Sequence, residues 1–65
     1  MRILINHTSF EMPEGSLLND AIALSNAKPP FAVAVNMQFI PKDQYLLVQL
    51  TQDDQVEIIS PITGG

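Results

Sequence analysis

Apolar and polar residues alternate at the start of the chain in a pattern that predicts a β-hairpin. Ile3 and Ile5 share one face of an extended opening segment, with Arg2, Leu4 and Asn6 on the opposite face. The polar residues 6–8 predict a turn, and the alternation that follows places Phe10 and Met12 on the inner face of a second strand.

A helical pattern follows the predicted hairpin. Residues 13–15, Pro-Glu-Gly, stop the second strand, Ser16 is the predicted N-cap, and Asp20 suits the positive end of the helix dipole. The apolar residues that recur at helical spacing are Leu17, Leu18, Ala21, Ile22 and Leu24. We expect the helix to end before the Pro29–Pro30 pair, because proline cannot continue it.

The second half of the chain predicts further strands. Phe31–Val35 is uncharged and rich in small and β-branched residues, which is typical of a buried central strand. A brief strand at Phe39–Ile40 ends at Pro41, and Val56–Ile59 is the last strand. The segment Tyr45–Leu50 fits a helix and a strand equally well, so its structure stays open at this point.

This order of elements predicts an α+β fold of the β-grasp, ubiquitin-like type. One main helix on one face of a mixed sheet of four to five strands buries a single core economically in 65 residues. We expect the first and last strands to lie side by side in the middle of the sheet. Residues 1–60 would form the β-grasp domain, and residues 61–65 a flexible C-terminal tail that ends in Gly-Gly.

Composition and charge then exclude several classes of partner. The chain has no cysteine, which excludes disulfides and thiolate metal sites. Three basic residues stand against seven acidic ones, and the net charge of −4 disfavours nucleic acid and anionic membrane surfaces as partners. Because the opening apolar run is too short for a signal peptide or a membrane span, we expect a cytoplasmic protein.

Residues for catalysis by the chain itself are scarce. Nucleophilic catalysis needs a base beside a serine or cysteine, and the single histidine, His7, lies in the predicted hairpin turn. Asp53 and Asp54 are either a solvated turn or the beginning of a cation site, and a glycine-rich phosphate loop is missing. We therefore expect no metal, no bound cofactor and no enzymatic activity of the chain on its own.

The C-terminus carries the most distinctive motif. Gly64 and Gly65 are two of only three glycines in the chain. Pro61 has no amide hydrogen, so the last strand should end near Ser60, and the residues beyond would reach ~20 Å when extended. Because glycine has no side chain, such a tail can pass through a narrow channel of a partner and present the Gly65 carboxylate. An ordinary frayed terminus is the alternative.

Ile59 is the candidate for partner docking beside this tail. Successive side chains of a strand point to opposite faces, so Ile58 and Ile59 cannot both enter the same core. Either Ile59 is exposed on the outer side of the sheet, or the Tyr45–Leu50 segment covers it. The sequence pattern favours neither of these two alternatives over the other.

Over essentially its whole length the chain resembles the ThiS family of thiamine-biosynthesis sulfur carriers. The matching pieces are Met1–Asn6, Pro13–Ser16, Val35–Asn36 followed by Ile40–Lys42, the aromatic Tyr45, Asp54–Ile58 and the terminal Gly64–Gly65. The chain departs from the family pattern at Asp53, where glycine is usual, and at Lys42 and Tyr45, where arginine and tryptophan are frequent. None of these departures lies in the tail.

The resemblance implies a mechanism in which partner enzymes do the chemistry. An adenylating, E1-like enzyme would use ATP to convert the Gly65 carboxylate into an acyl-adenylate. A sulfur donor, of the cysteine-desulfurase type or another, would then replace AMP and leave a thiocarboxylate for thiazole synthase to use. By the same resemblance Gly64 lets the tail thread, and Ile62 and Thr63 contact the channel wall.

Three other functions share the fold or the tail. The small subunit of molybdopterin synthase is also a sulfur carrier, although such chains are usually longer and lack the Asn…Pro-basic signature. A β-grasp interaction module would bind partners through its sheet without reacting. A ubiquitin-like modifier would end with Gly65 joined to a lysine.

Overall fold

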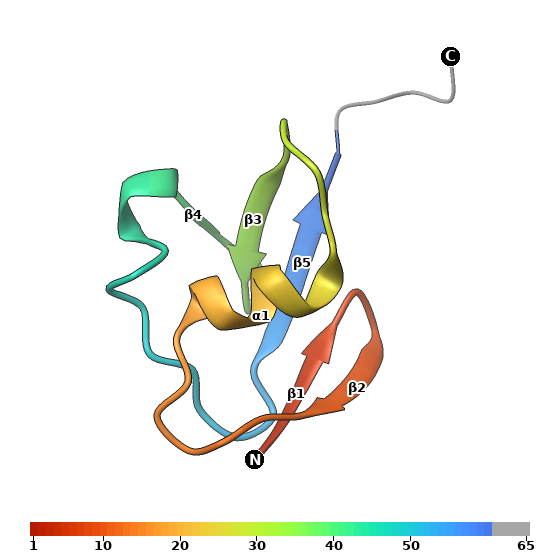
Figure 1. Ribbon diagram of the computed structural model, residues 1–65, viewed down its shortest axis with the longest axis vertical. Coiled ribbons are helices and arrows are strands. Elements are labelled where there is room, and N and C mark those ends of the chain that lie inside the picture. The colour runs from red at the N-terminus through yellow and green to blue at the C-terminus, as the bar shows by residue number, and fades with distance from the viewer. Residues whose placement is uncertain (61–65) are drawn as a thin grey trace.

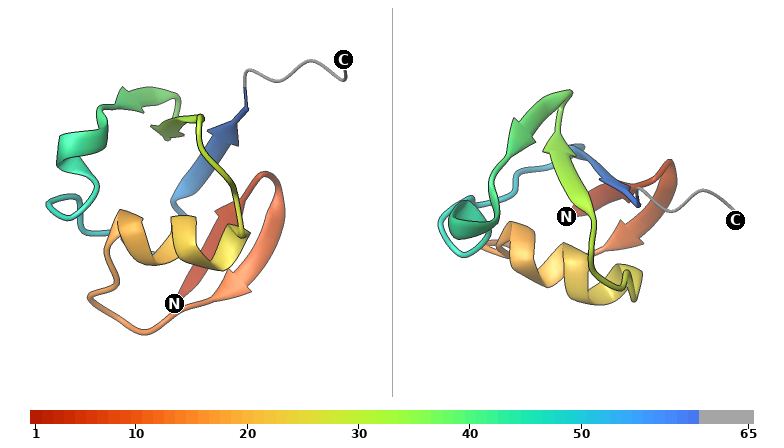
Figure 2. Two further views of the ribbon diagram at one scale, coloured as in Figure 1. Left: turned by 45° about the horizontal axis from the view of Figure 1, so that its top comes forward. Right: turned by 90° about the horizontal axis from the view of Figure 1, so that it is seen from above.

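The computed structural model describes residues 1–60. A mixed sheet of five strands, in the order β2-β1-β5-β3-β4, carries helix α1 on one face (Figures 1 and 2). The elements are β1 (Arg2–Ile5), β2 (Thr8–Glu11), α1 (Leu18–Ser25), β3 (Ala32–Val35), β4 (Gln38–Ile40), the 3₁₀ turn η1 (Lys42–Gln44) and β5 (Gln55–Ile59). This arrangement confirms the predicted β-grasp fold. Neither of the helices in residues 1–60 is long and apolar enough to cross a membrane.

β5 is the central strand of the sheet. It runs parallel to β1, with Leu4 opposite Gln55 and Ile5 opposite Val56. On its other side it runs antiparallel to β3. The first and last strands therefore lie side by side in the middle, as the sequence predicts.

The core lies between α1 and the sheet, and the period-two pattern of the strands decides which side chains enter it. The alternation places Ile3 and Ile5 of β1 and Val56 and Ile58 of β5 on the buried face. Met12 is buried and Phe10 packs against the core, which confirms their predicted inward direction. The other buried hydrophobic residues are Leu18, Ala21, Ile22, Val33 and Leu50.

Helix α1 begins one residue later than predicted, because Leu17 and not Ser16 is the N-cap. The Ser16 hydroxyl instead donates to the Pro13 carbonyl oxygen at 2.7 Å, which closes the preceding turn. Asp20 takes over part of the capping, since its carboxylate accepts a hydrogen bond from the Leu17 amide at 2.8 Å. At the other end, Asn26 adopts a left-handed conformation with φ of 58° and stops the helix.

The segment Tyr45–Leu50, whose structure the sequence left undecided, is neither a helix nor a regular strand. After η1 it forms turns and then an isolated antiparallel bridge between Gln49 and Leu17. The Leu18 amide donates to the Val48 carbonyl oxygen at 2.8 Å, and the Leu50 amide donates to the Ser16 carbonyl oxygen at 2.9 Å. The backbone of this segment therefore forms hydrogen bonds with the residues around the start of α1.

Candidate functional site

The end of β5 is the part of the structure from which the predicted tail begins. Ile59 is the last residue of β5 and pairs with Ala32 of β3. The predicted reactive residue Gly65 and the predicted threading residues Ile62, Thr63 and Gly64 lie outside the described residues. Their functions therefore stay predictions, and the structure defines the platform that precedes them.

Ile59 is exposed on the face of the sheet opposite α1. Its side chain is 57% exposed, whereas that of its neighbour Ile58 is 9% exposed and enters the core. The Tyr45–Leu50 segment does not cover Ile59, and this alternative was wrong because the segment bonds to the start of α1 instead. The docking function of Ile59 stays a prediction.

Ile59 belongs to a larger apolar surface on the same face. Cross-strand partners share a face of the sheet, so Ala32 lies with Ile59, and Ala34 lies with its β4 partner Phe39. The Phe39 side chain is 64% exposed. We call these four residues the outer-face patch: Ala32, Ala34, Phe39 and Ile59. Two large apolar side chains with small alanines between them extend from β5 to β4, and Glu57, the β5 partner of Ala34, lies on the same face of the sheet.

Sequence reasoning missed Phe39 as part of this surface. The signal lay in the alternation of β4, since Ile40 opposes the buried Val33 and packs against the core. Phe39 must then point to the opposite face. A strand of three residues is too short to show this period by itself.

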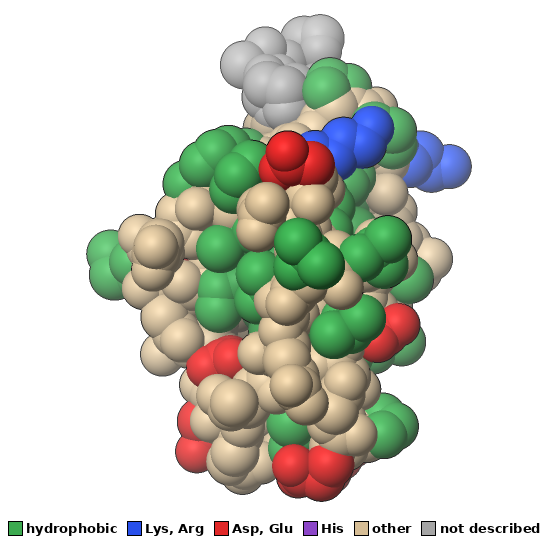
Figure 3. Space-filling view, turned by 90° about the vertical axis from the view of Figure 1, so that its left-hand side faces the viewer, with side chains coloured by type: hydrophobic (Ala, Val, Ile, Leu, Met, Phe, Trp, Pro, Cys, Tyr) green, Lys and Arg blue, Asp and Glu red, His purple; other side chains and the backbone are tan. Residues whose placement is uncertain are grey.

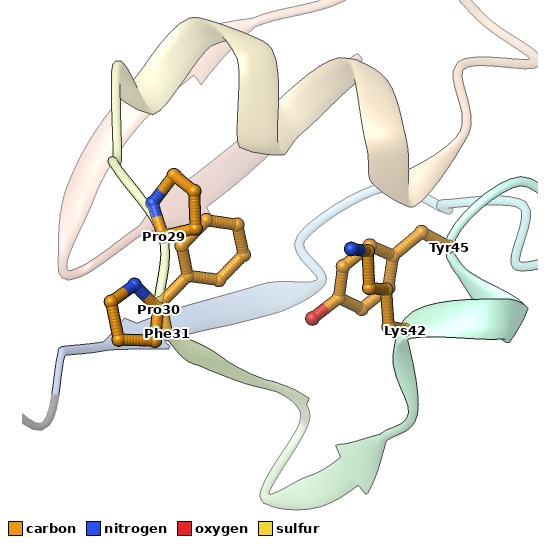
Figure 4. Close-up of a pocket in the computed structure, with 5 residues that line it drawn as sticks. All are labelled: Pro29, Pro30, Phe31, Lys42 and Tyr45. Atoms are coloured by element: carbon orange, nitrogen blue, oxygen red, sulfur yellow. The ribbon is translucent and has the colours of Figure 1, made fainter.

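A pocket lies beside the same end of the sheet. It has a volume of about 260 Å³ and is lined by Pro29, Pro30, Phe31, Lys42 and Tyr45 (Figure 4). The rings of Phe31 and Tyr45 are nearly parallel, with an interplanar angle of 13° and 6.3 Å between their centroids. The pocket therefore combines apolar walls with one ammonium group, directly before the start of β3.

Hydrophobic side chains also gather on the side of the molecule that contains β4 and η1 (Figure 3). In the turns that follow η1, the side chains of Leu46 and Leu47 are 66% and 70% exposed. Basic side chains lie towards the end of the molecule at which β5 ends, and most acidic side chains on this face lie further away (Figure 3).

The two candidate acids of the late turn have structural partners. Asp53 binds Arg2, with 2.7 Å between Oδ1 and Nη2. Asp54 accepts hydrogen bonds from the Thr51 amide at 2.8 Å and from Asn36 Nδ2 at 2.9 Å. Residues 1–60 hold no group of three or more His, Cys, Asp or Glu side chains that fits a metal ion. Residues 52–53 form the predicted turn, and the cation site stays the alternative prediction for this pair.

The family model of the ThiS family matches residues 2–65 of this sequence. The chain belongs to the ThiS family. A crystal structure of the thiamine biosynthesis protein ThiS from Geobacter metallireducens has a similar fold, with a TM-score of 0.82, 19% sequence identity and 100% coverage of both chains. No curated protein matches the chain by sequence.

Family membership gives a physical meaning to the departure at Asp53. This residue has φ of 69°, in the left-handed region where glycine is favoured. The resemblance described above implies glycine at this position. Here the chain places an aspartate in the same conformation, and its carboxylate holds the Arg2 side chain against the turn before β5.

Proposed function

We propose that this protein is a sulfur carrier of thiamine biosynthesis that carries sulfur as a thiocarboxylate on Gly65. The single observation that supports this most is the ThiS family match over residues 2–65, which includes both terminal glycines. In this proposal the chain is a protein co-substrate, and the catalysts are its partners.

The reaction begins at the Gly65 carboxylate. A carboxylate oxygen attacks the α-phosphorus of ATP in the adenylating enzyme, pyrophosphate leaves, and the acyl-adenylate forms. The terminal sulfur of a persulfide on the donor then attacks the acyl carbon, and AMP leaves. A thiol cleaves the resulting S–S bond by forming a disulfide with the donor, which leaves the thiocarboxylate that thiazole synthase consumes. The carrier needs no metal or bound cofactor for these steps, and ATP is a substrate of the partner.

The described residues contribute recognition to this sequence of reactions. The outer-face patch offers an apolar contact next to the residue at which β5 ends, so a partner can hold the sheet while its channel takes residues 61–65. The net charge of −4 favours a partner whose rim is basic, and such complementarity speeds encounter.

Intact-protein mass spectrometry tests the proposal. The chain is incubated with ATP, an adenylating enzyme shown to be active on its own carrier, and a sulfur donor. We expect the mass to change by the replacement of one oxygen atom by sulfur, and fragmentation to locate the change at Gly65. A variant that lacks Gly64 and Gly65 is the control and should keep its mass. An unchanged mass of the full chain would refute the proposal, and an adduct on lysine would indicate a protein modifier.

A growth assay separates the two classes of sulfur carrier. We expect the gene to rescue a strain that lacks its thiamine sulfur carrier and requires thiamine. We expect no rescue of a strain that lacks the small subunit of molybdopterin synthase. The opposite result would assign the chain to molybdenum cofactor synthesis.

A further inference from the structure

Asn6 holds the end of β5 through its side chain. The Ile58 amide donates to Asn6 Oδ1 at 2.8 Å, and Asn6 Nδ2 donates to the Ile58 carbonyl oxygen at 3.3 Å. Two residues earlier on β5, the Val56 carbonyl oxygen accepts a hydrogen bond from the Asn6 backbone amide at 2.9 Å. The side chain of Asn6 therefore continues the pairing of β1 with β5 beyond the point where the backbone of β1 ends.

The hairpin turn explains why a side chain is needed at this place. Asn6 and His7 have φ values of 48° and 70°, and the chain turns away from β5 into β2. The backbone of β1 consequently does not run alongside Ile58. An asparagine amide carries the same donor and acceptor as a peptide group, so it can replace the missing strand residue.

On its other edge, the end of β5 is held by β3, where Ala32 is the partner of Ile59. On that side Val33 is also the partner of Ile58, so Ile58 has β3 on one edge and Asn6 on the other. Ser60 follows Ile58 and Ile59 and is the last residue before the predicted tail.

We propose that Asn6 is a positioning residue for the reactions of Gly65. By holding Ile58 it keeps Ile58–Ser60 ordered before a partner binds, so that the partner has to order only the residues beyond. This inference rests on the proposed function. Each further backbone residue that a partner must order on binding weakens affinity by roughly a factor of five to thirty. The factor is smaller where new contacts in the complex offset part of this cost.

Asn36 provides a matched control, because its side chain contacts the same strand, β5, from another turn. It has φ of 50° at the same place in the β3–β4 turn. Its Oδ1 accepts a hydrogen bond from the Gln55 amide at 3.0 Å, and its Nδ2 donates to Asp54 Oδ1 at 2.9 Å. Asn36 thus holds the first residue of β5, at the end of the strand that is remote from the tail.

The test compares Asn6→Gly with Asn36→Gly in full-length protein. Glycine accepts the positive φ at both positions, so each variant removes the side-chain hydrogen bonds and keeps the turn. KM and kcat for the carrier are measured by ATP–pyrophosphate exchange with the adenylating enzyme, and thermal unfolding is followed in parallel. Both variants should lose a similar amount of thermal stability, since each loses hydrogen bonds to β5.

Only the Asn6 variant should show a defect in the reaction. We expect Asn6→Gly to raise KM roughly tenfold with little change in kcat. The reason is that the free energy needed to order Ile58–Ser60 reduces the affinity for the enzyme. Asn36→Gly should keep the KM of the unmodified chain. Asn6→Asp retains an acceptor for the Ile58 amide and loses the donor, so its KM should be intermediate.

An unchanged KM in Asn6→Gly, or an equal rise in Asn36→Gly, would overturn this role of Asn6. If the glycine variant does not fold, Asn6→Asp decides the question, and a KM equal to that of the unmodified chain overturns the proposal. The unmodified chain separates the two levels of the argument. Its failure to support exchange by a competent enzyme contradicts the proposed function, whereas exchange with no effect of Asn6 contradicts only the positioning role.

Discussion

Replacing Ile59 by alanine should weaken partner binding while leaving the fold almost unchanged. The Ile59 side chain is 57% exposed in the free protein. Complete burial of an isoleucine side chain contributes ~2.5 kcal/mol, so burial of the exposed part by a partner contributes about 1.4 kcal/mol. Because alanine retains one methyl group, we expect a loss of about 1 kcal/mol, which is roughly a fivefold rise in Kd.

Phe39 extends the same calculation across the outer-face patch. Its side chain is 64% exposed, and Phe39→Ala should weaken binding by a similar or slightly larger amount. The two residues lie on β4 and β5 with β3 between them. If their contributions add, the double variant should raise Kd by roughly 30-fold.

Isothermal titration calorimetry with the adenylating enzyme measures these changes, with the chain as titrant. Leu47→Ala is the matched control, because Leu47 is 70% exposed but lies in the segment that bonds to the start of α1. It should leave Kd unchanged. The reasoning fails if Ile59→Ala and Phe39→Ala bind like the unmodified chain, or if Leu47→Ala weakens binding as much as they do. Circular dichroism melts of each variant exclude unfolding as the cause.

Three further predictions concern stability, each measured by urea denaturation. Leu18→Ala should lower the free energy of unfolding by ~2–5 kcal/mol, because Leu18 is 0% exposed in the core, and a loss under 1 kcal/mol would contradict its central position. Gly15→Ala should lower it by ~1–2 kcal/mol through the backbone alone, since Gly15 has φ of 87° while an added Cβ would meet only Gln49 Nε2 at 3.8 Å. Arg2→Ala should lower it by only ~0.2–1 kcal/mol, because the ion pair with Asp53 is half exposed, and the difference should shrink at high salt.

The β-grasp fold could be predicted because core residues recur at every second position in its strands. Ile3 and Ile5 on one strand, and Val56 and Ile58 on another, enter the core from positions two residues apart. The same rule places Ile59 outside once Ile58 is inside. These features depend on local pattern and on the need to bury one core, and both can be read directly along the chain.

Features that depend on distant partners could not be predicted in the same way. The N-cap shifts from Ser16 to Leu17 because the Ser16 hydroxyl bonds to Pro13 while its carbonyl oxygen accepts the Leu50 amide. The Tyr45–Leu50 segment has no period of its own, since its partners are the residues that begin α1. Local sequence carries little information on such pairings, because they form only when the whole domain is assembled.

The hydrogen bonds between the Asn6 side chain and Ile58 are another feature that the sequence pattern could not predict. A polar residue after Ile5 predicts a turn, and the turn is there. The side-chain contacts to Ile58, however, join residues that are 52 positions apart. The turn is one reason for an asparagine at position 6, and the hydrogen bonds to Ile58 are a second reason that only the structure shows.

β5 links stability and function in this protein, and its side chains divide the two tasks between the faces of the sheet. Val56 and Ile58 enter the core, so changes at these positions should disturb folding and partner binding together. Ile59 faces outward, and the Asn6 amide holds Ile58 through the edge of the strand. Substitutions at Ile59 and Asn6 can therefore change how the chain meets its partner at a smaller cost in folding free energy. For this reason Ile59 allows the proposed carrier function to be tested with little change in stability, whereas a test at Asn6 needs the matched control at Asn36.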